Sequence, residues 1–478
     1  MKLLVVYDDR KIVANEVSAF VSVSSYGSIV FRQKTLSGKM QAICTEKNWA
    51  FCVIEDAAAL AKIKQSIAHH AADRVLWLSA SLAPLGGTAT INQMERMLLV
   101  DGNCVGTGPS DPHEAVAFDA EAKEVLEQIL SGKAIDDVDS YVDLSQAFVD
   151  VADLTNLVDY LSGALGARHF NSVKRSARKI IKFSTDKKKM KAEHDYFHLL
   201  PSSMKHWLVM PFDYEETEDG ASYSMERLML LDMGQQWING GMSLLNFQRF
   251  LEDVFQFVDE RPRKKISKEE ARTNFTSLYV DKVKHRFADF QKLEIYQFAD
   301  SMVRSATGEP SLASVYERYY SAIAKYIDRT LDYACIGHGD PCFSNILYDR
   351  RTRMLKLIDP KGATSEGELF THPLYDIAKL SHSILGGYDY ISNGLYDITL
   401  GTDLRLHLHT PEAMYAQYGG LFINELAARD LDPSGIRLLE ASLFLSMLPL
   451  HRDKPRNILA FILIAINILR EVENNAHV

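Results

Sequence analysis

The chain has 478 residues, of which 47% are hydrophobic and 24% charged, a composition typical of soluble globular proteins and unlike that of disordered chains. Its 53 Lys and Arg against 63 Asp and Glu give a formal charge of -10, which argues against a nucleic-acid-binding protein. The five cysteines form no CxxC pair, so we expect neither a disulfide framework nor a zinc site, and we predict a cytoplasmic location.

The apolar segments are too short to cross a membrane. The run Leu3–Tyr7 stops at two aspartates, and the most apolar stretch, Asn457–Leu469, has 13 residues, whereas a membrane span needs about 20. We therefore expect Asn457–Leu469 to be a buried helix of the last domain, and no membrane span.

Residues 1–135 alternate strand-like runs with helical stretches, which predicts an α/β domain. The opening MKLLVVYDD resembles the start of sugar nucleotidyltransferase-like proteins, although the glycine-rich nucleotide signature of that group is missing. The resemblance implies a nucleotidyltransferase-like remnant, and we expect a binding or assembly module. Asp8 and Asp9 could bind a metal ion or cap the strand.

Residues 150–232 predict a small sheet with one inserted helix, and residues 233–478 are mostly helical by periodicity. A polar block at 336–362 interrupts the helical part. The predicted fold class is therefore α+β, with a small β-rich lobe and a large helical lobe preceded by the α/β domain. This is the outline of a two-lobed kinase.

The polar block carries the motif on which the functional prediction depends. It reads IGHGDPCFSNILY from Ile336, followed by MLKLIDPKG from Met354. This pattern resembles the aminoglycoside phosphotransferase and choline kinase superfamily, which has a protein-kinase-like fold. The resemblance implies that Asp340 accepts the proton of a substrate hydroxyl, and that Asn345 and Asp359 bind Mg²⁺ beside ATP.

Chemistry supports the same assignment. Phosphoryl transfer depends mostly on alignment and on neutralising phosphate charge. Mg²⁺ prefers hard oxygen ligands from one or two protein groups together with phosphates. Either short motif alone would usually be a surface turn, but their joint spacing in a helical lobe favours a phosphotransferase.

The nucleotide-binding part of such a kinase needs a strand lysine that contacts the phosphates and a helix glutamate that orients this lysine. Lys182 and Glu193 are the candidates. Alternation places Lys179 on the opposite face of that strand, and we expect Ile181 and Phe183 to pack against the helix. No GxGxxG motif precedes Lys182; only Gly163 and Gly166 lie nearby, so the phosphate-covering loop is abbreviated.

Two further segments are candidate ligand contacts. The run YSMERL resembles the family strand that pairs with adenine through its backbone, which implies Met225 and Glu226 as nucleotide contacts. The polar turn with His451, Arg452 and Asp453 lies between two apolar helices. It is either part of the acceptor pocket or a helix-capping turn.

The sequence thus predicts an ATP- and Mg²⁺-dependent kinase acting on a small-molecule hydroxyl. The sequence around the motif resembles that of kinase-like proteins of bacterial capsule and surface-polysaccharide biosynthesis, which implies a sugar or polyol acceptor. Choline, ethanolamine and aminoglycosides are alternative acceptors. A nucleotide-binding pseudokinase that regulates a partner is the alternative of another class.

Overall fold

The computed structural model describes residues 2–56, 59–108, 114–133, 135–162, 171–175, 178–327, 331–411 and 415–475. The chain divides into two compact units. Unit 1 comprises Met1–Arg168 with Gln235–Gly241, and unit 2 comprises His169–Gly234 with Met242–Val478.

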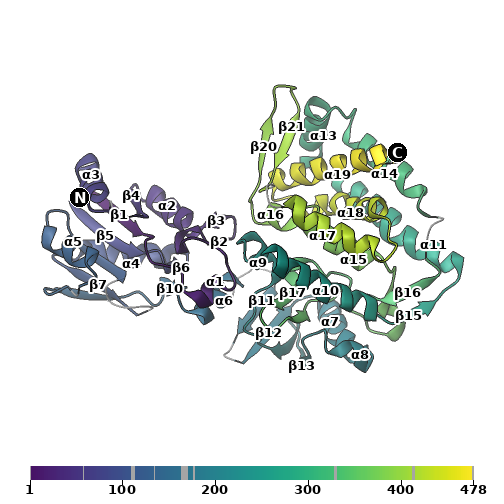
Figure 1. The fold of residues 1–478 in the computed structure, drawn as a ribbon, viewed down its shortest axis with the longest axis horizontal. Coiled ribbons are helices and arrows are strands. Elements are labelled where there is room, and N and C mark those ends of the chain that lie inside the picture. Colours follow the sequence, from purple (N-terminus) through teal and green to yellow (C-terminus); the bar gives the residue numbers. More distant parts are fainter. Residues whose placement is uncertain are drawn as a thin grey trace. The chain divides into compact units, whose positions relative to one another are not determined.

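Unit 1 is built on a mixed six-stranded sheet (Figure 1). Strand β1 pairs in parallel with both β4 and β5, whereas β8 runs antiparallel to β5 and β7. The sheet order is β4(Ala50–Ile54), β1(Leu3–Asp8), β5(Arg74–Ser79), β8(Ala115–Asp119), β7(Cys104–Thr107), β9(Ser140–Asp143). Its helices are α2(Leu36–Glu46), α3(Ala59–His70), α4(Gly87–Leu99) and α5(Lys123–Leu130).

The two aspartates after β1 are held by their own neighbours. Asp8 accepts hydrogen bonds from the Arg10 guanidinium at 2.8 and 3.0 Å. Asp9 accepts from the Ser25 hydroxyl at 2.6 Å and from the Gly27 N–H at 2.9 Å. These contacts favour the strand-capping interpretation of the pair over a metal site.

A short segment from later in the chain belongs to unit 1. Asn239 follows α9(Met233–Ile238), and its side chain exchanges hydrogen bonds with the backbone of Val30 at 2.7 and 3.2 Å. Unit 1 also extends beyond residue 150, where the sequence prediction began the small lobe. Its remaining elements are α1(Asn15–Ser18), β2(Val30–Phe31), β3(Lys34–Thr35), β6(Leu82–Pro84), β10(Phe148–Asp150) and α6(Leu154–Leu161).

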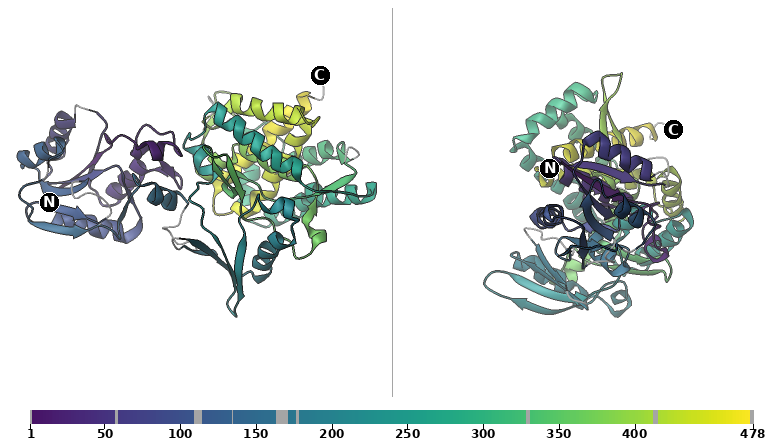
Figure 2. Two further views of the ribbon diagram at one scale, coloured as in Figure 1. Left: turned by 60° about the horizontal axis from the view of Figure 1, so that its bottom comes forward. Right: turned by 90° about the vertical axis from the view of Figure 1, so that its left-hand side faces the viewer.

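Unit 2 begins with a small antiparallel sheet. The strand order is β11(Asn171–Arg175), β12(Lys179–Ser184), β14(Ala221–Glu226), β13(Pro211–Glu216). Between β12 and β13 lie α7(Lys187–Leu199) and α8(Ser202–Lys205). Helix α7 is capped by Asp186 and buries Met190 against β14. In Figure 2 the strands of this lobe project from the helices of the large lobe.

The large lobe is predominantly helical, as predicted. Its helices are α10(Leu244–Glu260), α11(Lys268–Thr276), α12(Lys282–Gln291), α13(Ile295–Ala306), α14(Leu312–Ala324), α15(Tyr375–Ile384), α16(Tyr388–Ser392), α17(Tyr415–Ala427), α18(Pro433–Met447) and α19(Pro455–Asn475). Its strands are β15(Arg263–Lys265), β16(Tyr333–Ile336), β17(Ile346–Asp349), β18(Met354–Leu357), β19(Phe370–Thr371), β20(Asp397–Leu400) and β21(Leu406–His409). Unit 2 therefore has the predicted two-lobed, kinase-like fold.

The apolar stretch 457–469 is the buried core of α19, which confirms its prediction as an internal helix. No helix in the described part of the chain is long and apolar enough to span a membrane. The hairpin of β17 and β18 pairs Ile346 with Leu357, and it separates the two halves of the polar block.

Three buried histidines, His338, His372 and His382, make the stability of unit 2 depend on pH. Burial lowers the pKa of His372 to about 4, and burial also lowers the pKa of His338 and His382. In the unfolded chain each histidine has a pKa of about 6.5. Between pH values of about 4 and 6.5 the unfolded chain therefore binds more protons than the folded chain, and the free energy of unfolding rises with pH.

We expect His372→Gln to flatten this dependence. Lowering the pH from 7 to 5 should cost the wild-type chain about 2 kcal/mol through His372 alone, and urea unfolding at both pH values measures the difference. The exposed His285 provides the control, since His285→Gln should keep the wild-type dependence. Equal pH dependence in the two variants would contradict the assignment.

Candidate active site

The loop after β16 is held in place by a buried carboxylate. Asp376, in the first turn of α15, accepts the backbone N–H groups of His338 and Gly339, both at 2.9 Å. The Arg261 guanidinium donates to the same carboxylate at 3.0 Å. Because Asp376 and Arg261 are both buried, these bonds rigidify the turn that leads to Asp340.

Gly339 is required by this turn. Its φ is +81°, and a Cβ there would lie 2.6 Å from the Cβ of Lys361. A residue with a side chain would therefore be strained in its backbone and would clash with the next loop. This close approach brings the two halves of the polar block together.

Asp340 and Asn345 lie on one loop and contact each other. The Asn345 amide nitrogen donates to the Asp340 backbone carbonyl at 2.9 Å, which fixes the amide plane and the direction of its oxygen. The Asp340 side chain is 42% exposed and forms an ion pair of 2.9 Å with Lys379 of α15. Asp340 is thus accessible to a ligand while one of its oxygens is held.

Asp359 follows β18 in a left-handed backbone conformation, with φ of +55°. Such strain in a residue other than glycine is typical of functional sites. Two hydrogen bonds join its loop to the loop of Asp340 and Asn345: Ile358 N–H to the Asn345 carbonyl at 3.0 Å, and Lys361 N–H to the His338 carbonyl at 2.9 Å. The loops of Asn345 and Asp359 therefore move as one.

Lys182 connects the small lobe to Asp359. Its ammonium lies 2.6 Å from Glu193 Oε2 and 2.9 Å from Asp359 Oδ1. The Tyr223 hydroxyl donates to the same Glu193 oxygen at 3.0 Å. The side chains of Lys182 and Glu193 are 8% and 3% exposed, so this charged chain is nearly free of solvent screening.

Burial and charge act in opposite directions on Lys182. Burial alone would lower its pKa, but Asp359 and Glu193 together raise the pKa above the ordinary lysine value. The lysine therefore stays charged at neutral pH. Burial lowers the pKa of His338, so this histidine is neutral and supports the loop.

Lys179 lies on the other face of β12. Its side chain is 42% exposed and its ammonium is 3.5 Å from Asp213. The predicted packing of this strand is nevertheless wrong: Ile180, not Ile181 or Phe183, packs with Met190 of α7. Lys182 and Ile180 share one face of the strand because side chains alternate. That face is the one covered by α7, since Lys182 pairs with Glu193 of this helix.

Gly362 brings the Asp359 loop against α7. Its φ is +91°, and a Cβ would lie 2.7 Å from the backbone carbon of Ala192 and 2.9 Å from the nitrogen of Glu193. The next residue, Ala363, donates its N–H to the Ala192 carbonyl at 3.0 Å. Helix α7 thus contacts the Asp359 loop through its backbone as well as through Lys182.

The other predicted contacts lie in the same unit. Met225 pairs with Ile180 and Pro211 within the sheet, and Glu226 ends β14 with its side chain exposed. His451 packs edge-on against Phe461 at 5.0 Å, whereas Arg452 and Asp453 are exposed. Gly163 and Gly166 lie outside the described residues. The ligand roles of these side chains remain predictions.

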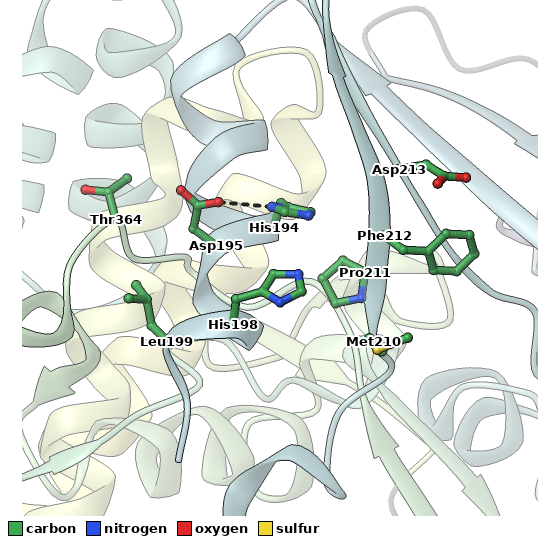
Figure 3. Close-up of a pocket in the computed structure, with 9 residues that line it drawn as sticks. All are labelled: His194, Asp195, His198, Leu199, Met210, Pro211, Phe212, Asp213 and Thr364. Carbon is green, nitrogen blue, oxygen red and sulfur yellow. Dashed lines mark hydrogen bonds and ion pairs between the residues drawn. The ribbon is translucent and has the colours of Figure 1, made fainter. Parts of the chain in front are cut away.

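A separate cavity of about 550 Å³ lies between α7 and β13. Figure 3 shows the two histidines of α7 pointing toward Pro211 and Phe212 of β13, with Asp195 hydrogen-bonded to His194. The cavity is lined by His194, Asp195, His198, Leu199, Met210, Pro211, Phe212, Asp213 and Thr364. None of the predicted site residues lines it.

The donor set near Asp359 fits Mg²⁺ bound together with phosphates. Asp359 offers a carboxylate that is 39% exposed, and Asn345 offers an amide oxygen on the adjoining loop. In the residues that the structure describes, no cluster of three His, Cys, Asp or Glu could hold a metal ion alone. Such a site would therefore take its remaining oxygens from nucleotide phosphates and water.

The sequence analysis did not identify Lys379 as part of the site. It lies three residues after Asp376 on α15, and the helical spacing puts both on the face toward the loop of Asp340. Tyr375 of the same helix turn accepts a hydrogen bond from Lys282 at 3.0 Å. The recognisable signal was the run Asp376-Ile-Ala-Lys379, in which the lysine follows the supporting aspartate by one turn.

No protein family model and no curated protein matches the chain. Among solved structures, one similar chain is a thermostable mutant of aminoglycoside phosphotransferase APH(4)-Ia in a ternary complex with AMP-PNP and hygromycin B. It is 11% identical, with a TM-score of 0.40 over 64% of this chain and 91% of the other. A Plasmodium vivax ethanolamine kinase is 9% identical, with a TM-score of 0.26 over 74% and 94%. The site is therefore interpreted from this chain's own side chains.

We expect Lys182→Met to destabilise unit 2, because it leaves the buried Glu193 with only the longer, 3.7 Å ion pair to the exposed Lys189. Breaking a buried ion pair costs about 3–5 kcal/mol, which urea unfolding would detect. Lys179→Met is the matched control on the same strand, and it should change stability by less than about 1 kcal/mol, since its ion pair with Asp213 is exposed. Similar losses in the two variants would contradict the burial difference.

Proposed function

We propose that the chain is an ATP- and Mg²⁺-dependent phosphotransferase that phosphorylates a hydroxyl group of a small molecule. The observation that carries this proposal is that Asp340, Asn345 and Asp359 lie on two loops joined by backbone hydrogen bonds, and that the Lys182–Glu193 pair of β12 and α7 contacts Asp359. Phosphoryl transfer needs three kinds of group, and these residues supply candidates for each: a base that accepts the proton of the substrate hydroxyl, ligands for the metal ion, and a lysine that contacts the phosphates.

In this proposal each residue has a distinct task. Asp340 orients the substrate hydroxyl and accepts its proton. Lys182, held by Glu193, contacts the nucleotide phosphates. Asn345 and Asp359 would hold Mg²⁺, which neutralises phosphate charge when it is bound. Met225 and Glu226, at the end of β14, are the proposed neighbours of the adenine.

The charge around Asp340 favours a neutral or anionic acceptor. Choline, ethanolamine and aminoglycosides carry a cation, and the carboxylate closest to the reaction is already paired with Lys379 at 2.9 Å. A sugar or polyol brings hydroxyl groups without that positive charge. We therefore propose a sugar or polyol acceptor, and His451, Arg452 and Asp453 as its candidate contacts.

A pseudokinase that binds ATP and regulates a partner is the competing function. The complete set of Asp340, Asn345 and Asp359 favours an enzyme over it. ATP consumption with a panel of sugars, polyols, amino alcohols and aminoglycosides, together with calorimetric titration of ATP with and without Mg²⁺, separates the two. Tight binding without turnover on the whole panel would support the pseudokinase.

We expect Asp340→Asn to keep ATP binding and to lose turnover. General-base catalysis contributes about 10²–10⁴-fold, so kcat should fall by that factor while calorimetry shows unchanged Mg-ATP affinity. Wild-type kcat in this variant would remove Asp340 from the base role.

We expect Asp359→Ala to weaken Mg-dependent ATP binding more than Asn345→Ala does, because a carboxylate supplies charge as well as an oxygen ligand. The ratio of ATP affinities with and without Mg²⁺ measures this. An unchanged ratio in Asp359→Ala would show that the metal assignment is wrong.

A further inference from the structure

Lys379 occupies an unusual place for a lysine. Its side chain is 16% exposed, and its ammonium lies 2.9 Å from Asp340 Oδ1, on the carboxylate proposed to accept the substrate proton. Among the described residues, this is the one polar partner of the ammonium within hydrogen-bond distance. An ammonium has three N–H donors, so Lys379 can donate to a further acceptor beside Asp340.

The surroundings keep this lysine charged. Burial alone would lower the pKa of Lys379, but Tyr375, Asp340 and Cys342 raise it well above the ordinary lysine value. Conversely, burial would raise the pKa of Tyr375, but Lys379 and Lys282 lower it below the ordinary tyrosine value. Two lysines, Lys379 and Lys282, thus act on Tyr375 on this side of Asp340.

A buried charge that points at an exposed partner is costly unless it serves a ligand. Desolvating an ammonium costs several kcal/mol, and Asp340, at 42% exposed, could be solvated without a lysine. The pair also differs from the Arg261–Asp376 pair, whose side chains are only 4% and 0% exposed. Lys379 thus keeps a small exposed fraction next to the more exposed Asp340.

The reaction geometry brings the transferred group close to Lys379. A hydroxyl activated by Asp340 must lie about 2.6–3.2 Å from its carboxylate, and the attacked phosphorus about 3–3.5 Å beyond that oxygen. The ammonium is already 2.9 Å from the same carboxylate. An equatorial phosphoryl oxygen therefore falls within reach of a flexible lysine side chain.

Resting on the proposed kinase function, we propose that Lys379 is a catalytic residue that donates one hydrogen bond to Asp340 and another to the γ-phosphoryl group during transfer. The acceptor oxygen forms its bond to the γ-phosphorus as the bond from that phosphorus to the β-γ bridging oxygen breaks. ADP leaves with that electron pair, and the hydroxyl proton passes to Asp340. Lys379 remains protonated throughout.

This role differs from that of Lys182. Lys182 pairs with Glu193 and Asp359, on the side of the site where the nucleotide phosphates and Mg²⁺ are proposed to bind. Lys379 pairs with the base, where charge develops as the phosphoryl group moves. A donor aimed at developing charge contributes to kcat more than to ground-state binding.

The test measures kcat, KM for ATP, and calorimetric Mg-ATP affinity on the full chain, with the panel acceptor that the wild-type enzyme phosphorylates. Lys379→Met should lower kcat by about 10²–10³-fold, the loss typical of one transition-state donor, with Mg-ATP affinity within about threefold. Lys379→Arg should recover at least about a tenth of wild-type kcat, since it keeps the charge. Lys292→Met is the control, since it removes the lysine of an exposed Asp–Lys pair and should leave kcat unchanged.

A double variant separates catalysis from mere neutralisation of Asp340. Asp340→Asn with Lys379→Met removes both charges and leaves neither group unpaired. If Lys379 contacts the phosphoryl group, single-turnover rates should fall at least about tenfold below those of Asp340→Asn alone. Equal rates, or wild-type kcat in Lys379→Met, would overturn the proposal while leaving the kinase function standing. A wild-type chain that neither binds Mg-ATP nor turns it over would overturn both.

Discussion

The ammonium of Lys182 is the contact on which the geometry of the site depends. It lies between Glu193 of the small lobe and Asp359 of the large lobe, at 2.6 and 2.9 Å. Because Lys182 and Glu193 are almost completely buried, neither charge can be satisfied by water. Strand β12 and helix α7 must therefore keep their relative positions, or a buried charge is left uncompensated. The same ammonium attracts the carboxylate of the Asp359 loop.

Backbone contacts enforce the same arrangement. Gly362 allows its loop to approach α7 to a distance that a Cβ would block, and Ala363 donates to the Ala192 carbonyl. Asp376 holds the other loop through two N–H groups. Since hydrogen bonds also join the two loops, a displacement of α7 would be transmitted to the loop of Asn345. The position of α7 is thus coupled to the positions of Asn345 and Asp359.

The sequence predicted the residues whose signal is local. Asp340, Asn345 and Asp359 lie within one short block, and their spacing around a predicted hairpin was enough to propose a shared site. Lys182 and Glu193 could be selected because one strand and the next helix carry them. The packing of that strand could not be derived from side-chain size: Ile181 and Phe183 are larger in sum than Ile180, yet pairing with Glu193 decides which face is covered.

Contacts between segments that lie far apart in the sequence could not be predicted from any comparable local pattern. Lys379 is on a later helix, and only the fold shows that its ammonium meets Asp340. The attachment of Asn239 to Val30 in unit 1 is likewise a tertiary contact, since nothing in the run around Asn239 distinguishes it from its helical neighbours. In unit 1 the hydrophobic runs predicted the strands, but their order in the sheet follows from crossover connections that a run does not encode.

The two lysine–aspartate pairs divide the proposed reaction between them. Lys182 has two carboxylate partners, so that cluster retains a net negative charge suited to a metal ion. Lys379 and Asp340 together are neutral, so a phosphoryl group that moves toward them meets a positive donor without a net attraction for cations. In the proposed reaction, this difference favours phosphate oxygens near Lys379 and the metal ion near Asp359.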